Sequence, residues 1–253
     1  MLSLDVTEPA EIVLRIAAAH PVTENLSVTA DGRAVRVVEL DGRQHVVRVP
    51  AGSVIVGYSA QVRGEHGGRR HGGDPVTEVE RIEALRPSRY CPSDRMLGFA
   101  TRQFGPAPDP AAIAGWVFER LSYEVGSSIV TTDAIDTLLT GAGVCRDYAH
   151  LTGTLCRAVN IPARVAAVYA PGLSPMDFHL VVETAVDGRW LAWDATRLAP
   201  RHSLIRIATG RDAADTALAT TLSGFLTVSD LQITAVAAGD LVVDDHTSPV
   251  TLA

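Results

Sequence analysis

The stretch that decides the fold lies in the middle of the chain, where residues 141–162 read GAGVCRDYAHLTGTLCRAVNIP. Two glycines open the stretch as a turn, because glycine adopts backbone conformations that other residues avoid. From Val144 onward, apolar residues recur at helical spacing as far as Pro162, which cannot continue a helix. The pattern predicts a helix over about 144–160. A second row of small side chains follows the same helix, so we expect it to be buried.

Cys145 is predicted to lie in the first turn of this helix. Backbone N–H groups at a helix N-terminus have no partner within the helix and carry positive potential. They stabilise a thiolate, and they can donate hydrogen bonds to the oxyanion that forms when a thiolate attacks a carbonyl. Cys145 is therefore predicted as a nucleophile. Cys91 and Cys156 are interpreted as small, buried apolar side chains in a reducing compartment.

A hairpin follows the helix. Asp187-Gly188 is typical of a two-residue turn, and it joins two apolar runs that are predicted as strands over 178–186 and 189–195. A turn of this kind pairs Val186 with Arg189 and thereby fixes the register of both strands. A further strand is predicted over 164–170.

This register brings together two groups that a nucleophilic cysteine requires, a base and a group that orients the base. His179 and Asp194 fall on the same face of the hairpin as diagonal neighbours, within reach of an imidazole–carboxylate hydrogen bond. A slip of one residue would place them on opposite faces. Cys145, His179 and Asp194 are therefore the predicted catalytic residues.

Other readings of nearby residues are weaker. His150 lies five residues after Cys145, which is about 140° around a helix, so it is not expected to serve as the base. Asp147 is interpreted as a carboxylate that complements the helix dipole. A zinc site made from His66, His71 and Cys145 has too few ligands, and no metal is expected.

The rest of the chain shows a change of pattern. Turn dipeptides and period-2 alternation predict an antiparallel meander or small sandwich in the first part of the chain. Helical patterns follow over 93–105, 110–123 and 132–139, and one more strand is predicted over 225–236. The predicted organisation is a β-rich domain (1–62), a glycine-rich loop and linker (63–85), a catalytic core (86–236) and an acidic, poorly ordered tail (237–253).

Four short segments carry a family resemblance: GAGVCRDYAH at 141–150, NIPAR at 160–164, FH at 178–179 and WDAT at 193–196. Together they resemble the bacterial transglutaminase-like family, and the β-rich start of the chain resembles the region that precedes this core in many members. The resemblance implies an α+β, papain-like core with the cysteine helix packed on an antiparallel sheet. It also implies a thiol enzyme that needs no cofactor, acting on an amide-type carbonyl through a thioester. Tyr123, Thr131 and Thr132 are the candidates for a side-chain oxyanion donor.

Composition excludes several classes of protein. The chain has 253 residues, 47% of them hydrophobic, and a formal net charge of −7, which argues against a nucleic-acid partner. It contains no lysine, which excludes a lysine Schiff base or a P-loop lysine. No membrane-spanning run is predicted, and Asp5 and Glu8 near the start argue against a signal peptide, so a cytoplasmic location is expected.

The sequence leaves the acceptor of the acyl group open. Hydrolysis of an amide or peptide-like bond in a protein or peptide-like substrate is the preferred reading. Transfer to an amine, as in protein cross-linking, is the alternative within the same chemistry. A binding or scaffold protein that kept the fold and lost activity is the alternative from a different class. Nothing in the sequence predicts the oligomeric state.

Overall fold

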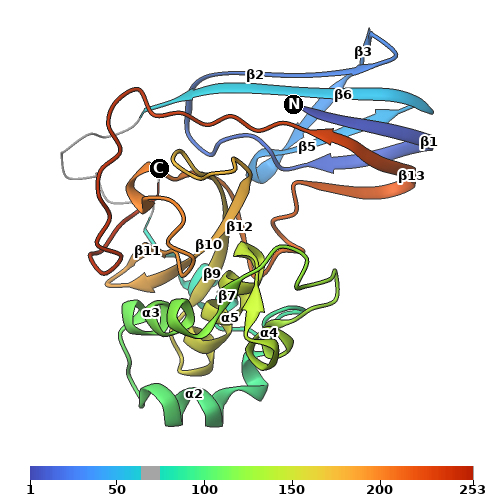
Figure 1. Ribbon diagram of the computed structural model, residues 1–253. Coiled ribbons are helices and arrows are strands. Elements are labelled where there is room, and N and C mark those ends of the chain that lie inside the picture. The colour runs from blue at the N-terminus through green and yellow to red at the C-terminus, as the bar shows by residue number, and fades with distance from the viewer. Residues whose placement is uncertain (64–74, 253) are drawn as a thin grey trace.

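The computed structural model describes residues 1–63 and 75–252. A large curled β-sheet lies over a layer that combines a second sheet with helices (Figure 1). The fold is α+β, as the sequence predicts. His66 and His71 of the predicted glycine-rich loop lie outside the described residues. Within the described ranges, no helix is long and apolar enough to cross a membrane.

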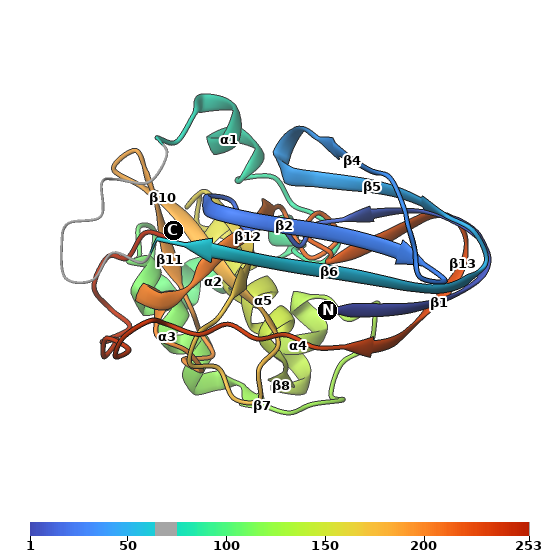
Figure 2. The ribbon, with the colours of Figure 1, turned by 90° about the horizontal axis from the view of Figure 1, so that it is seen from above.

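The larger sheet is built mostly from the start of the chain. All its pairings are antiparallel, in the order β3-β2-β6-β1-β5-β4, with β13 also paired to β1. Figure 2 shows β2, β6 and β1 running side by side. The strands are β1 (Leu2–Leu14), β2 (Pro21–Ala30), β3 (Arg33–Ala34), β4 (Val37–Leu40), β5 (Gln44–Val49), β6 (Gly52–Val62) and β13 (Ala219–Leu231).

Alternation of apolar side chains explains why these segments form a sheet. Leu2, Leu4 and Val6 of β1 are buried, while the residues between them face outward. The predicted turn at Asp31-Gly32 joins β2 to β3, with φ of 47° and 76° at its two central residues. A short 3-10 helix, Asp41–Arg43, occupies the second predicted turn.

The last strand differs from its predicted place. The sequence predicts a strand over 225–236 within the catalytic core, whereas β13 pairs along the whole length of β1, from Leu2 opposite Leu231 to Leu14 opposite Ala219. A strand pattern in a sequence is local, and it does not identify a pairing partner more than 200 residues away. The chain therefore returns to its first sheet after building the second one (Figure 1).

The second sheet is antiparallel, in the order β11-β10-β9-β12. Its strands are β9 (Ala163–Tyr169), β10 (Phe178–Val186), β11 (Arg189–Trp193) and β12 (Ile205–Gly210). The predicted register is confirmed, because Val186 pairs with Arg189. Both turn residues, Asp187 and Gly188, have positive φ (48° and 73°), as a tight hairpin turn requires.

Helices cover one face of the second sheet (Figure 1). Helix α5 (Cys145–Ala158) packs on β9 and β10, and it is buried along almost its whole length. Asp109 and Asp133 cap the helices that follow them, each accepting a hydrogen bond from a backbone N–H two residues on. The other helices are α1 (Glu78–Glu83), α2 (Leu97–Phe104), α3 (Pro110–Arg120), α4 (Ala134–Thr140) and the 3-10 turns Ser93–Arg95 and Arg201–Ser203.

The C-terminal segment is anchored, whereas the sequence predicts a poorly ordered tail over 237–253. Asp244 forms a buried ion pair with Arg201, at 2.7 Å between Oδ1 and Nη2. The Val250 carbonyl accepts a hydrogen bond from the backbone N–H of Ala192 in β11 at 2.7 Å. Leu252 is also buried. The acidic composition of this segment suggests that it is solvated. It does not reveal that a buried arginine elsewhere in the chain pairs with one of its carboxylates.

Candidate active site

Two glycines place Cys145 at the first position of α5. Gly141 ends α4 in the left-handed conformation, with φ of 73°, which costs glycine little. Gly143 lies so close to Asp147 that an added Cβ would come within 2.7 Å of the Asp147 Cβ. The chain therefore turns sharply into α5, and the Cys145 side chain is left partly exposed.

Asp147 holds the start of this helix. Its side chain is fully buried, and its Oδ2 accepts hydrogen bonds from the Val144 backbone N–H (2.9 Å) and the Ser128 hydroxyl (2.6 Å). The neighbouring Arg146 donates to Oδ1 at 3.0 Å. The carboxylate thus closes the first turn of α5 beneath Cys145, in the position expected for a negative charge at a helix N-terminus.

His179 and Asp194 form the hydrogen bond that the hairpin register predicts. His179 Nε2 donates to Asp194 Oδ2 at 2.8 Å, and the two residues are 2% and 4% exposed. His179 lies in β10, and Asp194 directly follows the last residue of β11. The Cys145 side chain also acts on the pKa of His179, which places the thiol beside the imidazole. The three residues predicted from the sequence therefore lie together.

Burial and charge act in opposite directions on the His179 imidazole. Burial alone lowers its pKa, because an apolar environment disfavours the imidazolium. The Asp194 carboxylate and the Cys145 side chain outweigh this effect and raise the pKa of His179 to about 10. In turn, His179 and Thr196 lower the pKa of Asp194, although its burial acts to raise it. The pair is therefore an imidazolium beside a carboxylate at neutral pH.

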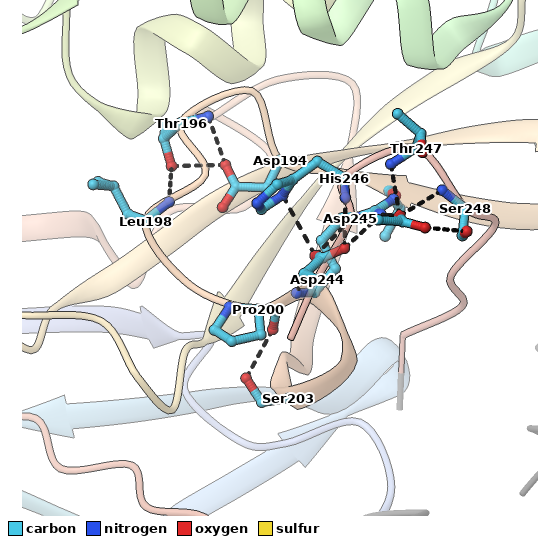
Figure 3. Close-up of polar contacts among 12 residues, drawn as sticks. Asp194, Thr196, Leu198, Pro200, Ser203, Asp244, Asp245, His246, Thr247 and Ser248 are labelled. Atoms are coloured by element: carbon cyan, nitrogen blue, oxygen red, sulfur yellow. Dashed lines mark hydrogen bonds and ion pairs between the residues drawn. The ribbon is translucent and has the colours of Figure 1, made fainter. Parts of the chain in front are cut away.

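Thr196 fixes the orientation of Asp194. Asp194 Oδ1 accepts hydrogen bonds from both the Thr196 hydroxyl (2.7 Å) and the Thr196 backbone N–H (2.8 Å) (Figure 3). The other carboxylate oxygen is left for His179. Thr196 belongs to the WDAT segment at 193–196, and the sequence predicts no role for it. The spacing of an aspartate and a threonine two residues apart is the available signal, because short polar side chains bond to nearby backbone in this way.

The C-terminal segment supports the same loop from the other side. Arg201 donates from Nη1 to the Ala192 carbonyl at 2.9 Å, and its Nε and backbone N–H both donate to Asp244 Oδ2. Figure 3 shows Asp244 and Asp245 lying close to the loop that runs from Asp194 to Ser203. The end of the chain is thereby connected, through Arg201, to the strand that carries Asp194.

Tyr123 is the predicted oxyanion-donor candidate that the structure brings to the nucleophile. It belongs to a short parallel pair, β7 (Ser122–Tyr123) and β8 (Ala142–Gly143), in which Tyr123 lies opposite Gly143. Its hydroxyl lies beside Cys145, whose backbone and side chain both act on the pKa of Tyr123. Burial raises the pKa of Tyr123 to about 12, and the charges of Cys145 and Asp177 act in the same direction. The phenol is therefore a protonated donor at neutral pH.

The two threonine candidates have other surroundings. Thr132 accepts a hydrogen bond from the Ile129 backbone N–H at 3.0 Å, which closes its own turn. For Thr131, the described part of the structure records no hydrogen bond to Cys145. Tyr123 is therefore the candidate that the structure places beside Cys145.

His150 occupies the buried side of α5. It is fully buried, its Nε2 accepts a hydrogen bond from the Ala213 backbone N–H at 3.1 Å, and its ring stacks on Tyr90 with 5.1 Å between centroids. Burial lowers the pKa of His150 to about 4, so the ring is neutral. These contacts agree with the expectation that His150 and Cys145 point in different directions.

A cavity of about 150 Å³ opens beside the thiol. Its walls come from α5, from β9 and β10, and from the segment between β12 and β13, and Arg15 adds a wall from the end of β1 in the larger sheet. The lining residues are Arg15, Cys145, Arg146, Ala167, Phe178, His179, Leu180, Ala213, Thr216, Ala217 and Leu218. Over residues 1–63 and 75–252, no three His, Cys, Asp or Glu side chains are grouped so that they would hold a metal ion.

Comparison with known proteins identifies the family of the core. Residues 97–195 match the model of the transglutaminase-like superfamily. A crystal structure from Cytophaga hutchinsonii, of a protein proposed to be a cysteine protease, superimposes with a TM-score of 0.74 at 31% identity. That match covers 94% of this chain and 91% of the other.

A curated protein of Mycobacterium leprae, which is uncharacterized, is 31% identical over 115 residues. The match covers 44% of this chain and 40% of the relative, so the chain spans less than half the length of that relative. The full-length structural match and the matched core agree on one family. The chain belongs to the transglutaminase-like superfamily.

Proposed function

We propose that this protein is a cysteine-dependent hydrolase that cleaves an amide or peptide-like bond through a thioester on Cys145. The observation that carries the proposal is the buried His179–Asp194 hydrogen bond of 2.8 Å beside a cysteine at a helix N-terminus. A merely structural cysteine needs neither a charged histidine nor an orienting carboxylate. The likeness to a protein proposed to be a cysteine protease supports the same chemistry.

In the acylation half-reaction, Cys145 Sγ attacks the carbonyl carbon and forms a C–S bond. Negative charge then develops on the carbonyl oxygen. The backbone N–H of Cys145, at the start of α5, and the Tyr123 hydroxyl are the proposed donors to this oxyanion. The C–N bond breaks as the His179 imidazolium gives its proton to the departing amine, and the acyl group stays on sulfur as a thioester.

In the second half-reaction, His179 is neutral and accepts a proton from a water molecule that attacks the thioester. The C–S bond breaks, the acid leaves, and the imidazolium–thiolate pair is restored. Asp194 keeps the imidazole in one orientation throughout, with its other oxygen held by Thr196. The proposed catalytic residues are therefore Cys145, His179 and Asp194, and no step requires a cofactor.

Thioester trapping tests this proposal directly. Mixed peptide amides are incubated with the protein, acid-quenched, and the acyl adduct is located by mass spectrometry of the digested chain. We expect the adduct on Cys145, and none in Cys145→Ala, which leaves the fold intact because the thiol is partly exposed. Cys91 and Cys156 are matched internal controls, because both are buried and burial raises the pKa of each thiol.

The second candidate function is a scaffold without activity. It predicts that Cys145 reacts with iodoacetamide at neutral pH no faster than an ordinary exposed cysteine. The buried imidazolium beside Cys145 predicts the opposite, a clearly faster reaction. Slow alkylation of Cys145, together with no adduct in the trapping experiment, would exclude the proposed thiol chemistry.

A further inference from the structure

One charged residue of the cavity comes from an unexpected place. Arg15 directly follows β1 of the larger sheet, yet it lines the same cavity as Cys145 and His179. It is brought there by the β1–β13 pairing, since the Arg15 backbone N–H donates to the Leu218 carbonyl at 2.9 Å. The larger sheet therefore contributes a wall to the cavity in which the proposed reaction takes place.

The Arg15 guanidinium is held in place by neutral oxygens. Nη2 donates to the Gln44 side-chain oxygen at 2.9 Å, and Nη1 donates to the backbone carbonyl of Asp215. The nearby Asp215 carboxylate is engaged by Arg211, which reaches it through its backbone N–H and Nε, each at 2.9 Å. In the described part of the chain, no carboxylate forms an ion pair with Arg15. The Asp215 carboxylate does feel this charge, because Arg15 contributes to lowering the pKa of Asp215, but within the described residues it lies beyond ion-pair distance and is held by Arg211.

The other charged groups of the cavity do not offset this charge. Arg146 also lines the cavity, and its own partner is the buried Asp147 beneath the helix. No aspartate or glutamate is among the lining residues, and the remaining lining side chains are apolar apart from Thr216 and the reacting pair. The cavity therefore presents excess positive charge to whatever enters it, although the whole chain is acidic.

From these contacts we infer that Arg15 binds a carboxylate of the substrate, so that the preferred substrate carries an acidic group next to the amide that is cleaved. That the bound molecule is a substrate rests on the proposed function. The existence of an anion site at Arg15 does not. The cavity, at about 150 Å³, is small for a ligand site, which suits a short acidic group. A guanidinium matches the planar geometry of a carboxylate.

Two alkylating reagents that differ in charge test this inference at Cys145. Iodoacetate carries the carboxylate, and iodoacetamide is its neutral counterpart. The ratio of their rate constants at Cys145, followed by mass spectrometry at low ionic strength, measures the attraction for the anion alone. We expect Arg15→Gln to lower this ratio about three- to tenfold, the size expected for one nearby charge at a partly exposed site. The iodoacetamide rate of the same variant is the reference, because dividing by it removes any change in the reactivity of the thiol itself.

Two matched variants separate a specific site from a general charge effect. Arg15→Lys keeps the charge, and it should retain most of the ratio. Arg48→Gln removes an exposed arginine from the same sheet, away from the cavity, and it should leave the ratio unchanged. An unchanged ratio in Arg15→Gln, or an equal fall in Arg48→Gln, would overturn the inference.

A binding measurement keeps this outcome separate from the proposed function. In the Cys145→Ala background, glutarate should raise the melting temperature relative to sodium chloride of equal ionic strength, and the rise should disappear on adding Arg15→Gln. If neither reagent alkylates Cys145 but this rise depends on Arg15, the thiol chemistry fails and the anion site stands. If the rise is absent, or is the same without Arg15, the anion site fails.

Discussion

At the scale of single residues, His179 is where the site is most sensitive to change. Burial lowers its pKa, and the hydrogen bond and charge of Asp194 reverse that effect. In the proposed mechanism, the departing amine takes its proton from His179, and burial would leave His179 neutral without Asp194. The proposed chemistry depends on Asp194 for charge as well as for orientation.

Asp194→Asn should therefore lower kcat by a large factor, up to about 10⁴ by comparison with orienting aspartates in other triads. The pKa of His179 should fall from about 10 toward the low value that burial favours. An NMR titration of the imidazole measures this shift. Asp187→Asn is the matched control, because it removes an exposed carboxylate from the turn of the same hairpin. An unaltered His179 titration would remove Asp194 from the site.

The same pKa predicts how stability depends on pH. Because the pKa of His179 is raised above its ordinary value of 6.5, protonation of His179 stabilises the folded state most fully below about pH 6.5. That contribution is lost as the pH rises toward about 10. Urea unfolding of the unmodified protein should therefore show a decline in stability over this window. The decline should be much smaller in Asp194→Asn, and equal slopes would contradict the assignment.

Tyr123→Phe tests the proposed oxyanion donor. The variant keeps the ring and its contact with Tyr148, at 5.9 Å between centroids, and it loses only the hydroxyl. Removal of one such donor costs about 10²–10³ in kcat in other enzymes, and we expect a loss of this size with little change in melting temperature. Tyr90→Phe is the control, because its hydroxyl bonds to the Val130 carbonyl instead. Equal kcat values for both variants would leave the oxyanion to backbone donors.

The sequence predicts some of these residues well and others not at all. His179 and Asp194 could be paired because a two-residue turn fixes the register of a hairpin, and that relation is local. Arg15 could not be found in this way. It reaches the cavity through the pairing of β1 with β13, and no pattern around residue 15 identifies that partner.

At the scale of elements, helix α5 was predictable because its signals are all local. The glycines before it, the apolar rows along it and Pro162 after it lie within about 22 residues of one another. Strand β12 was missed for the opposite reason. Arg206, the second residue of the strand, is buried and pairs with Glu183 of β10, so a charged side chain interrupts the apolar pattern. The two partners of this ion pair are far apart in the sequence, so a local pattern around residue 206 does not predict the pair.

The C-terminal segment gives a prediction at this scale. Asp244→Ala leaves Arg201 buried without its carboxylate, and breaking such a pair costs about 3 kcal/mol or more. Hydrogen exchange should rise in the segment after residue 240 and in the loop that follows β11. Asp240→Ala is the control, because Asp240 is exposed. Protection that is unchanged in Asp244→Ala would mean that the ion pair does not anchor the segment.

This anchor should respond to acid in a defined direction. Hydrogen bonds from Arg201 and His246 lower the pKa of Asp244 to about 2, against the effect of burial. Because the pKa of Asp244 is lowered on folding, the ionised carboxylate stabilises the folded state at pH values above its ordinary pKa of 3.8. That stabilisation disappears as the pH falls through about 2. The segment is therefore expected to stay anchored at every pH at which the enzyme would work.

At the scale of the whole molecule, the two sheets depend on each other. Strand β13 comes from the end of the chain and completes the sheet that the first 62 residues begin. The second sheet and its helices lie in the sequence between β6 and β13. Arg15 and Leu218, joined at this crossing, both line the cavity beside Cys145. The larger sheet is therefore part of the proposed site, and it is not an independent appendage.

The fate of the thioester also belongs to this scale, because it depends on which acceptor the assembled site admits. Cys145 is partly exposed, and water is present at about 55 M, so an amine competes only where the protein binds it specifically. The cavity presents Arg15 and Arg146, which repel a protonated amine. The chain contains no lysine, so it cannot cross-link itself through lysine side chains. We therefore expect hydrolysis to dominate.

Partitioning of one acyl donor between water and a labelled primary alkylamine measures this preference. At millimolar amine we expect free acid as the main product, and the small amount of labelled amide should rise linearly with amine, without saturation. In Arg15→Gln the amide share should increase, because less positive charge then opposes the protonated amine. The amine titration at two salt concentrations is the control, since screening should raise the amide share of the unmodified protein toward that of the variant. A saturable dependence with amide as the main product would instead show a bound amine, and the protein would be a transferase.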